Sequence, residues 1–208
     1  MTRFLATLLL ALGLFQTAAL AKGLENPETV AALNRIEAYL KSLTTVKARF
    51  IQTNPDGSYD EGTMYLDRPG RMRFEYDPPT PLLLLSNGLF FIHVDLDLEQ
   101  VSHIPLKLTS AYFLLREDIG FDQGLVVTGY GSEAGVTRIE VVQEDEPDAG
   151  SVVMTFSENP LQLRQWTVTD AQRQRTTVTM LDPEFGVELS GELFNYHAPW
   201  EKDRGKNR

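Results

Sequence analysis

Three histidines are the residues of this sequence whose type first suggests metal binding or proton transfer. His93, His103 and His197 could each ligate a metal, but none has a second ligand at the helical or hairpin spacing that would fix a tetrahedral site. The chain has no cysteine, which excludes thiolate ligands and a cysteine nucleophile. We therefore interpret the histidines as polar residues at strand ends, and we expect no metal site and no cofactor.

Three acidic residues alternate with leucines along a predicted strand. Asp95, Asp97 and Glu99 could bind calcium or supply the carboxylate pair of a glycosidase. The stretch lacks the central glycine of a calcium-binding loop, and its neighbours supply no acid–base context. We prefer the interpretation of a solvated strand face.

Serine chemistry and phosphate binding are also without support. Ser86 and Ser110 lie outside any G-x-S-x-G sequence, and the glycines at 129 and 131 lead into a turn instead of a helix that could hold phosphate. Because no nucleophile, base and orienting group can be assigned together, we expect that the protein is not an enzyme.

The residues that stand out are apolar and lie in the stretch 66–94. Met72, Phe74 and Tyr76 alternate with charged residues, which is the two-residue period of a strand with one buried face. The run 82–85 consists only of leucine, and the turn residues 86–88 lead from it into the run 89–94. This predicted hairpin carries more apolar surface than a half-exposed sheet requires.

Arg68 is the polar exception in this stretch, because it stands directly before Pro69 at the mouth of the apolar hairpin. An arginine at a strand end can extend its charged group to solvent while its methylenes pack on apolar surface. The pattern leaves that interpretation and a functional role open.

The remaining sequence predicts a mainly β protein with two helices. Asn26 and Pro27 form a helix start, and apolar residues recur at helical spacing over 27–43. A short apolar helix over 109–116 is a candidate plug or lid. Strands are expected at 46–53, 62–67, 71–77, 82–85, 89–94, 101–104, 125–130, 136–143, 151–157, 161–169, 175–181 and 187–196. So many strands favour one large, curved antiparallel sheet with a helix across its concave face.

The two ends of the chain differ from its middle. Residues 1–21 combine a basic start, a short apolar run and an A-x-A sequence, which is typical of a secretory signal peptide. We expect one domain over 22–199 and a loose basic tail over 200–208. A net charge of −10 argues against nucleic acid as a partner. Without cysteine the mature chain cannot carry the lipid anchor of a bacterial lipoprotein, and its stability must come from core packing.

These residues resemble the LolA family, the periplasmic carrier proteins that take lipoproteins to the outer membrane of Gram-negative bacteria. The likeness is carried by Leu66-Asp67-Arg68-Pro69 and the strands that follow it to Phe91, with Glu99-Gln100-Val101 continuing the pattern. The strand at 46–52 and the residues 163–176 extend it. The resemblance covers nearly the whole mature chain, through a distributed pattern and not through one specific motif.

The resemblance implies an incomplete (half) antiparallel β-barrel with an α-helical lid over an apolar cavity for acyl chains. In the family, the arginine of the Arg-Pro pair hydrogen-bonds to the lid backbone and latches the empty closed form, and that role falls here to Arg68. We expect the cavity to be lined by Met72, Phe74, Tyr76, Leu83, Leu85 and Phe91.

The implied function is that of a monomeric periplasmic carrier of acylated lipoproteins. An inner-membrane ATP-driven lipoprotein-releasing complex would supply the cargo, and an outer-membrane receptor or the outer membrane itself would take it. Two departures bear on these partners: Met72 replaces an aromatic residue that helps docking to the release machinery, and Ala198-Pro199-Trp200 replaces a C-terminal Pro-Pro-Gly.

Three alternatives stay open at this point. The same half-barrel could serve a sensor of lipoproteins or lipids, although a sensor usually carries a second domain. It could also carry a free lipid or another small apolar ligand. An esterase that uses the cavity as its acyl pocket ranks last, because no catalytic groups can be assigned.

Overall fold

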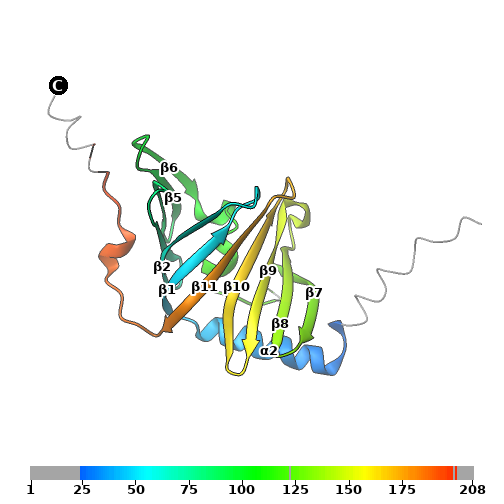
Figure 1. The fold of residues 1–208 in the computed structure, drawn as a ribbon. Coiled ribbons are helices and arrows are strands. Elements are labelled where there is room, and N and C mark those ends of the chain that lie inside the picture. The colour runs from blue at the N-terminus through cyan, green and yellow to red at the C-terminus, as the bar shows by residue number, and fades with distance from the viewer. Residues whose placement is uncertain (1–23, 122, 199, 201–208) are drawn as a thin grey trace, which may run out of the picture.

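A computed structural model describes residues 24–121, 123–198 and 200, and its strands form one antiparallel sheet (Figure 1). The strand order is β6-β5-β4-β3-β2-β1-β11-β10-β9-β8-β7. The strands are β1 (Thr45–Thr53), β2 (Tyr59–Asp67), β3 (Arg71–Tyr76), β4 (Leu82–Asn87), β5 (Phe90–Asp95), β6 (Gln100–Pro105), β7 (Leu125–Glu133), β8 (Val136–Gln143), β9 (Gly150–Glu158), β10 (Leu161–Asp170) and β11 (Arg175–Phe185).

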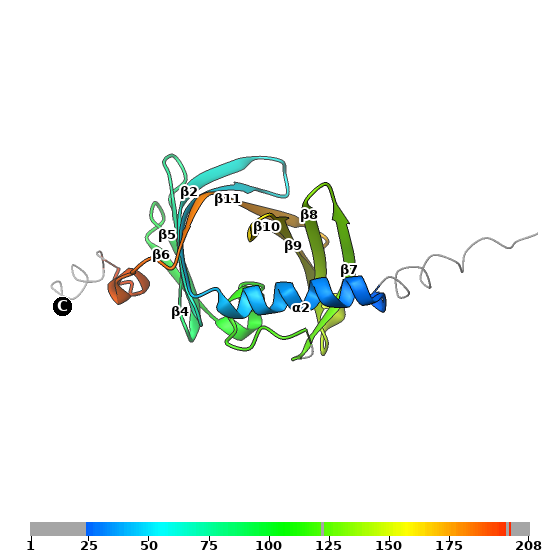
Figure 2. The same cartoon turned by 90° about the horizontal axis from the view of Figure 1, so that it is seen from below.

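This strand order divides the sheet into two halves that are each a simple meander. Strands β1 to β6 follow one another outwards, and β7 to β11 return inwards until β11 pairs with β1. The sheet curls so that its edge strands β6 and β7 approach the two sides of an opening, which helix α2 (Pro27–Ser42) and the connection between β6 and β7 cross (Figure 2). The prediction of an incomplete antiparallel barrel is therefore confirmed.

Helix α2 confirms the helix predicted at 27–43 and is fixed to the sheet at several points. It begins at the N-cap Asn26, whose side chain accepts a hydrogen bond from the amide of Glu28. Ile36 and Leu40 are fully buried against the concave face. The backbone amide of Leu163 on β10 donates a hydrogen bond of 3.1 Å to the Tyr39 hydroxyl. Among the helices that the structure describes, none combines the length and apolar content needed to cross a membrane.

The connection between β6 and β7, residues 106–121, is here called the lid segment. The predicted helix at 109–116 is shorter in the structure: a 3₁₀ turn, η1 (Leu106–Leu108), precedes a four-residue helix, α3 (Tyr112–Leu115). Ala111 is the N-cap residue of α3 and supplies no side-chain hydrogen bond, so no capping side chain stabilises the start of this helix. Phe113 and Leu115 are buried in the core beneath it.

The prediction of a strand at 187–196 is wrong. Strand β11 ends at Phe185, and Gly186 then adopts a φ of +68°, which turns the chain away from the sheet. The chain continues outside the barrel (Figure 2), where it forms the 3₁₀ turn η3 (Gly191–Phe194). The apolar residues of this stretch cover the convex face and do not add a strand.

The prediction that Asp95, Asp97 and Glu99 form a solvated strand face is also wrong. Residues 96–99 form the turn between β5 and β6, and the Asp95 carboxylate accepts hydrogen bonds from the amides of Asp97 and Leu98. These are the contacts of an aspartate that caps a turn. The expected signal peptide at 1–21 and residues 201–208 of the expected tail lie outside the described residues.

Candidate functional site

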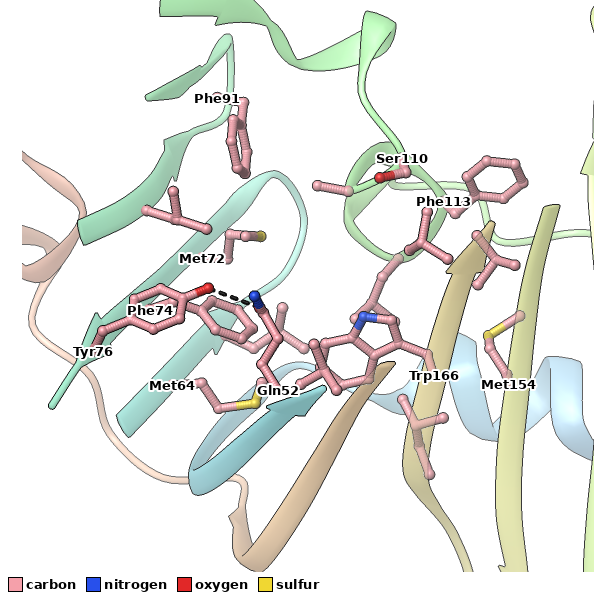
Figure 3. Close-up of a pocket in the computed structure, with 18 residues that line it drawn as sticks. Gln52, Met64, Met72, Phe74, Tyr76, Phe91, Ser110, Phe113, Met154 and Trp166 are labelled. Atoms are coloured by element: carbon pink, nitrogen blue, oxygen red, sulfur yellow. Dashed lines mark hydrogen bonds between the residues drawn. The ribbon is translucent and has the colours of Figure 1, made fainter. Parts of the chain in front are cut away.

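An apolar cavity of about 150 Å³ lies between the concave face of the sheet and the lid segment (Figure 3). The first half of the sheet contributes Gln52, Met64, Leu66, Met72, Phe74, Tyr76, Leu84 and Phe91 to its wall. The second half contributes Val152, Met154, Leu163, Trp166, Val168 and Val178. The lid segment closes it with Ser110, Ala111, Phe113 and Leu114. Nearly all of these side chains are hydrocarbon, thioether or aromatic.

Strand register explains why these residues share one face. Met72 pairs with Leu66 and Phe74 pairs with Met64 across the β2–β3 hairpin, so the alternation on β3 is repeated on β2. The Phe74 ring meets the Trp166 ring edge to face at 6.3 Å between centroids, which joins the two halves of the sheet. The apolar wall therefore continues from one half of the sheet to the other.

Four of the six predicted cavity residues line this cavity: Met72, Phe74, Tyr76 and Phe91. Leu83 and Leu85 do not. They lie on the other face of β4, in a separate apolar cluster with Ile92 and Val94, and Leu84 between them faces the cavity instead. A run of four leucines carries no alternation, so the sequence could not say which of them faces inwards.

Several cavity residues were missed by sequence reasoning. Met64 and Leu66 could have been found by pairing the alternating residues of β2 with those of β3, as the hairpin register does. Trp166 and Val178 share the cavity because their strands, β10 and β11, return beside β1. That return is a long-range pairing with no local sequence signal.

One end of the cavity is polar. The Tyr76 hydroxyl donates to Gln52 Oε1 at 2.8 Å, and Gln52 Nε2 donates to Asn54 Oδ1 at 2.8 Å. Asn54 Nδ2 continues the chain to the carboxylate of Asp60 at 2.7 Å. Burial, followed by the negative charge of Asp60, raises the pKa of Tyr76, so its hydroxyl stays protonated and donates.

Arg68 lies at the opposite end, between the last turn of α2 and the lid segment. Its Nη1 donates to the carbonyl oxygens of Leu40 and Leu43, the latter at 3.2 Å, and its Nη2 donates to the carbonyl oxygen of Arg116 at 2.9 Å. The amide of Gly70 adds a bond of 2.8 Å to the carbonyl of Leu115. One guanidinium therefore holds both elements that cross the opening.

The electrostatic setting of Arg68 suits this contact. Helix C-termini carry partial negative charge, and the carbonyls that Arg68 binds belong to the C-terminal turn of α2 and to the residue that ends α3. Burial lowers the pKa of Arg68 to about 10, so the guanidinium is still charged at neutral pH. Its Nε has no partner among the described residues, so the contact rests on the two terminal nitrogens.

No metal centre is assembled from the described residues, where no group of three or more histidine and acidic side chains converges. His93 on β5 pairs with Ser102, whereas His103 pairs with Ile92, so the two histidines face opposite sides of the sheet. They lie inside strands β5 and β6 and not at the expected strand ends.

The volume of the cavity is small compared with that of most ligand pockets. Pockets for drug-sized ligands measure roughly 300–1,000 Å³, and an apolar cavity of about 150 Å³ holds a molecule the size of benzene. Phe113 and Leu114 of the lid segment occupy the space against the wall. A larger apolar ligand does not fit the cavity with these two side chains in this position.

Comparison with known proteins finds relatives among carrier proteins of other bacteria. An outer-membrane lipoprotein carrier protein of Pseudomonas paraeruginosa is 30% identical over 193 residues, 88% of this chain and 92% of the relative. One of Methylococcus capsulatus is 26% identical over 174 residues, 80% and 83% of the two chains. A solved LolA superfamily protein from Nitrosomonas europaea aligns with a TM-score of 0.45 at 8% identity, covering 79% of this chain and 97% of that one.

A family model for the outer membrane lipoprotein carrier protein LolA matches residues 41–197, which include Arg68 and the whole sheet wall of the cavity. The chain therefore belongs to the LolA family.

Proposed function

We propose that this protein is a periplasmic carrier that encloses the acyl chains of lipoproteins released from the inner membrane and delivers them to the outer membrane. The observation that carries the proposal is the pairing of an apolar cavity with a lid held by one arginine. Family membership and the names of the relatives support it.

The physical need for such a cavity follows from the cost of hydrating an acyl chain. Each methylene exposed to water costs about 0.8 kcal/mol, so a long chain must be shielded along most of its length. A permanently open apolar concavity would promote aggregation. A lid that closes when the cavity is empty meets both requirements.

Arg68 couples binding to opening in this proposal. An acyl chain entering against Phe113 and Leu114 displaces the lid segment and breaks the bonds to the carbonyls of Leu43 and Arg116. The empty form regains those bonds, so closure favours release of the cargo. The cycle needs binding and release only, and no step of it requires a catalytic group.

The proposal includes the partners expected from the sequence. The protein would act as a monomer, receive its cargo from an inner-membrane ATP-driven releasing complex, and pass it to an outer-membrane receptor or to the outer membrane itself. Export by the expected signal peptide would place it in the periplasm.

Replacing Arg68 tests the latch. Arg68→Leu removes the bonds to both α2 and the lid segment, so we expect the variant to keep its lipoprotein and to transfer it to acceptor membranes about tenfold more slowly. Arg68→Lys keeps the charge but cannot bridge both elements, and should be intermediate. Transfer at the normal rate by Arg68→Leu would contradict the role of the latch.

A matched control is Arg35→Leu. Arg35 also ties α2 to the sheet, through an exposed ion pair of 2.8 Å with Glu158, and exposed pairs contribute little. Its transfer rate should equal that of the unmodified protein.

Mass spectrometry of protein purified from its native envelope separates the carrier from the alternatives. A co-purifying triacylated lipoprotein supports carriage of lipoproteins, and a free lipid supports a carrier of another ligand. Protein without either would favour a sensor.

A further inference from the structure

Trp166 places a hydrogen-bond donor inside the apolar cavity. Its indole lines the wall, packs against Phe74 and turns its nitrogen towards the cavity (Figure 3). The Nε1–H forms no hydrogen bond with any residue that the structure describes. An indole nitrogen can only donate, so this group is complementary to an acceptor oxygen.

Strand register puts Trp166 in line with the polar end of the cavity. Gln52 on β1 pairs with Val178 on β11, and Val178 pairs with Trp166 on β10, so the three residues form one row across the sheet. Adjacent strands are about 4.8 Å apart, so Gln52 and Trp166 are separated by one strand only. Gln52 accepts from Tyr76 and donates to Asn54, whereas the indole of the same row makes no hydrogen bond within the described residues.

The cavity has a direction because its two ends differ. Met64, Leu66 and Met72 lie towards the strand ends that lead to Arg68 and α2, and they offer no donor. Gln52 and Tyr76 lie towards the opposite strand ends.

A second cleft of about 460 Å³ opens at that polar end. It shares Ser110, Phe113 and Val168 with the cavity and continues to the turn residues beyond β10. The polar end is therefore the side on which the cavity adjoins solvent.

We propose that Trp166 binds the carbonyl oxygen through which an acyl chain is attached to its carrier molecule, and so selects ester- or amide-linked chains and orients them. The carbonyl lies at Trp166, the head group lies in the second cleft, and the hydrocarbon runs towards Arg68. This inference rests on the proposed function, because it identifies the chemistry that the same cavity recognises.

The orientation connects recognition to release of the latch. A chain that enters with its methyl end first reaches the Met64, Leu66 and Met72 end of the cavity, next to the elements that Arg68 holds. Its carbonyl then stops at the row of Gln52 and Trp166. The donor thus fixes how far the chain extends towards the latch.

The test compares two lipids that differ only in the carbonyl. A dipalmitoyl glyceride and its dihexadecyl ether have the same chains and glycerol, but the ether lacks both carbonyl oxygens. We expect the protein to bind both and the ester about three- to tenfold more tightly, as loss of one hydrogen bond predicts. Trp166→Phe keeps the ring against Phe74 and should bind the two lipids equally.

A direct readout uses the indole ¹H–¹⁵N signals. The chain has two tryptophans, so Trp200→Phe assigns the Trp166 signal without altering the cavity. The Trp166 signal should move downfield when the ester binds and not when the ether binds. This measurement leaves Trp166 itself unmutated.

Equal affinity of the unmodified protein for both lipids, or an ester preference that survives in Trp166→Phe, would overturn the role of Trp166 and leave the carrier function intact. Binding of neither lipid would overturn both proposals.

Discussion

Strand β4 is apolar on both faces, but the two faces pack against different parts of the molecule. Leu84 points into the cavity, under a lid held by a few hydrogen bonds. Leu83 and Leu85 point to the convex side, where Leu85 is 0% exposed and packs with Ile92 and Val94. Neighbouring residues of one strand therefore belong to the cavity beneath the lid segment and to a separate cluster on the convex side.

The cover of the convex face explains the difference. Phe194 of η3 is 1% exposed, and the Arg71 guanidinium lies 5.4 Å from the centre of its ring. Arg73 Nη1 donates to the carbonyl oxygen of Leu193 at 3.0 Å, and Tyr196 and Trp200 extend the cover over the leucine cluster. Both segments are anchored by buried side chains, but only the lid segment lies over an incompletely filled cavity. Stability is therefore expected from the convex side and ligand binding from the concave side.

The largest effect should come from removing the anchor of the convex cover. Phe194→Ala leaves a cavity at a fully buried site and should lower the free energy of unfolding by about 3–5 kcal/mol. Urea unfolding followed by circular dichroism measures this. A loss below about 1 kcal/mol would mean that the segment is not a fixed part of the fold.

Leu85→Ala should cost about 2–5 kcal/mol, because its side chain is fully buried in the convex cluster. Its affinity for an acyl lipid, measured where the variant is folded, should equal that of the unmodified protein. A large loss of affinity at unchanged stability would place Leu85 functionally with the cavity and remove the contrast between the two faces.

Leu84→Ala is the matched test on the concave face. Leu84 is half-buried, so its truncation should cost less than about 1 kcal/mol of stability. It should reduce acyl-lipid affinity about three- to tenfold, because a bound chain would cover that side chain. Fluorescence titration with a lipid probe gives the affinity, with Leu85→Ala as the control.

The smallest effect concerns the polar end of the cavity at high pH. Because the pKa of Tyr76 is raised in the folded state, the folded protein holds that proton after the unfolded chain has lost it. Stability is therefore complete below the ordinary tyrosine pKa of about 10 and declines as pH rises above it. Relative to Tyr76→Phe, the unmodified protein should lose less than about 1 kcal/mol between pH 9 and 10.5. Parallel curves for the two proteins in urea would contradict the raised pKa.

Local pattern was sufficient for most of the elements but not for the surfaces they form. Asn26 and Pro27 marked the start of α2, and the alternation of Met72, Phe74 and Tyr76 assigned the inward face of β3. The leucine run had no polar face from which to choose. Long-range placement of Trp166, which depends on the pairing of β1 with β11, had no sequence signal at all.

The role of the C-terminal stretch was missed for a related reason. Residues 187–196 contain apolar side chains that fit a strand, but the φ of +68° at Gly186 sends them to the convex face. In the sequence, apolar residues that cover a sheet as a second layer look the same as apolar residues that form another strand of that sheet. Arg68 stood out in the sequence as a polar exception, but a latch role was expected for it only from the family resemblance. Its acceptors are backbone carbonyls, which carry no side-chain signature.

The strand order also has a consequence for how the chain assembles. In the described sheet, every pairing except β1 with β11 joins strands that are consecutive in the sequence. Each meander can therefore form from short-range hairpins, which are fast because little chain entropy is lost in closing them. The pairing of β1 with β11, here called the seam, joins the two meanders into the single sheet that surrounds the cavity. The cavity, whose wall draws on both meanders, exists only after that seam has formed.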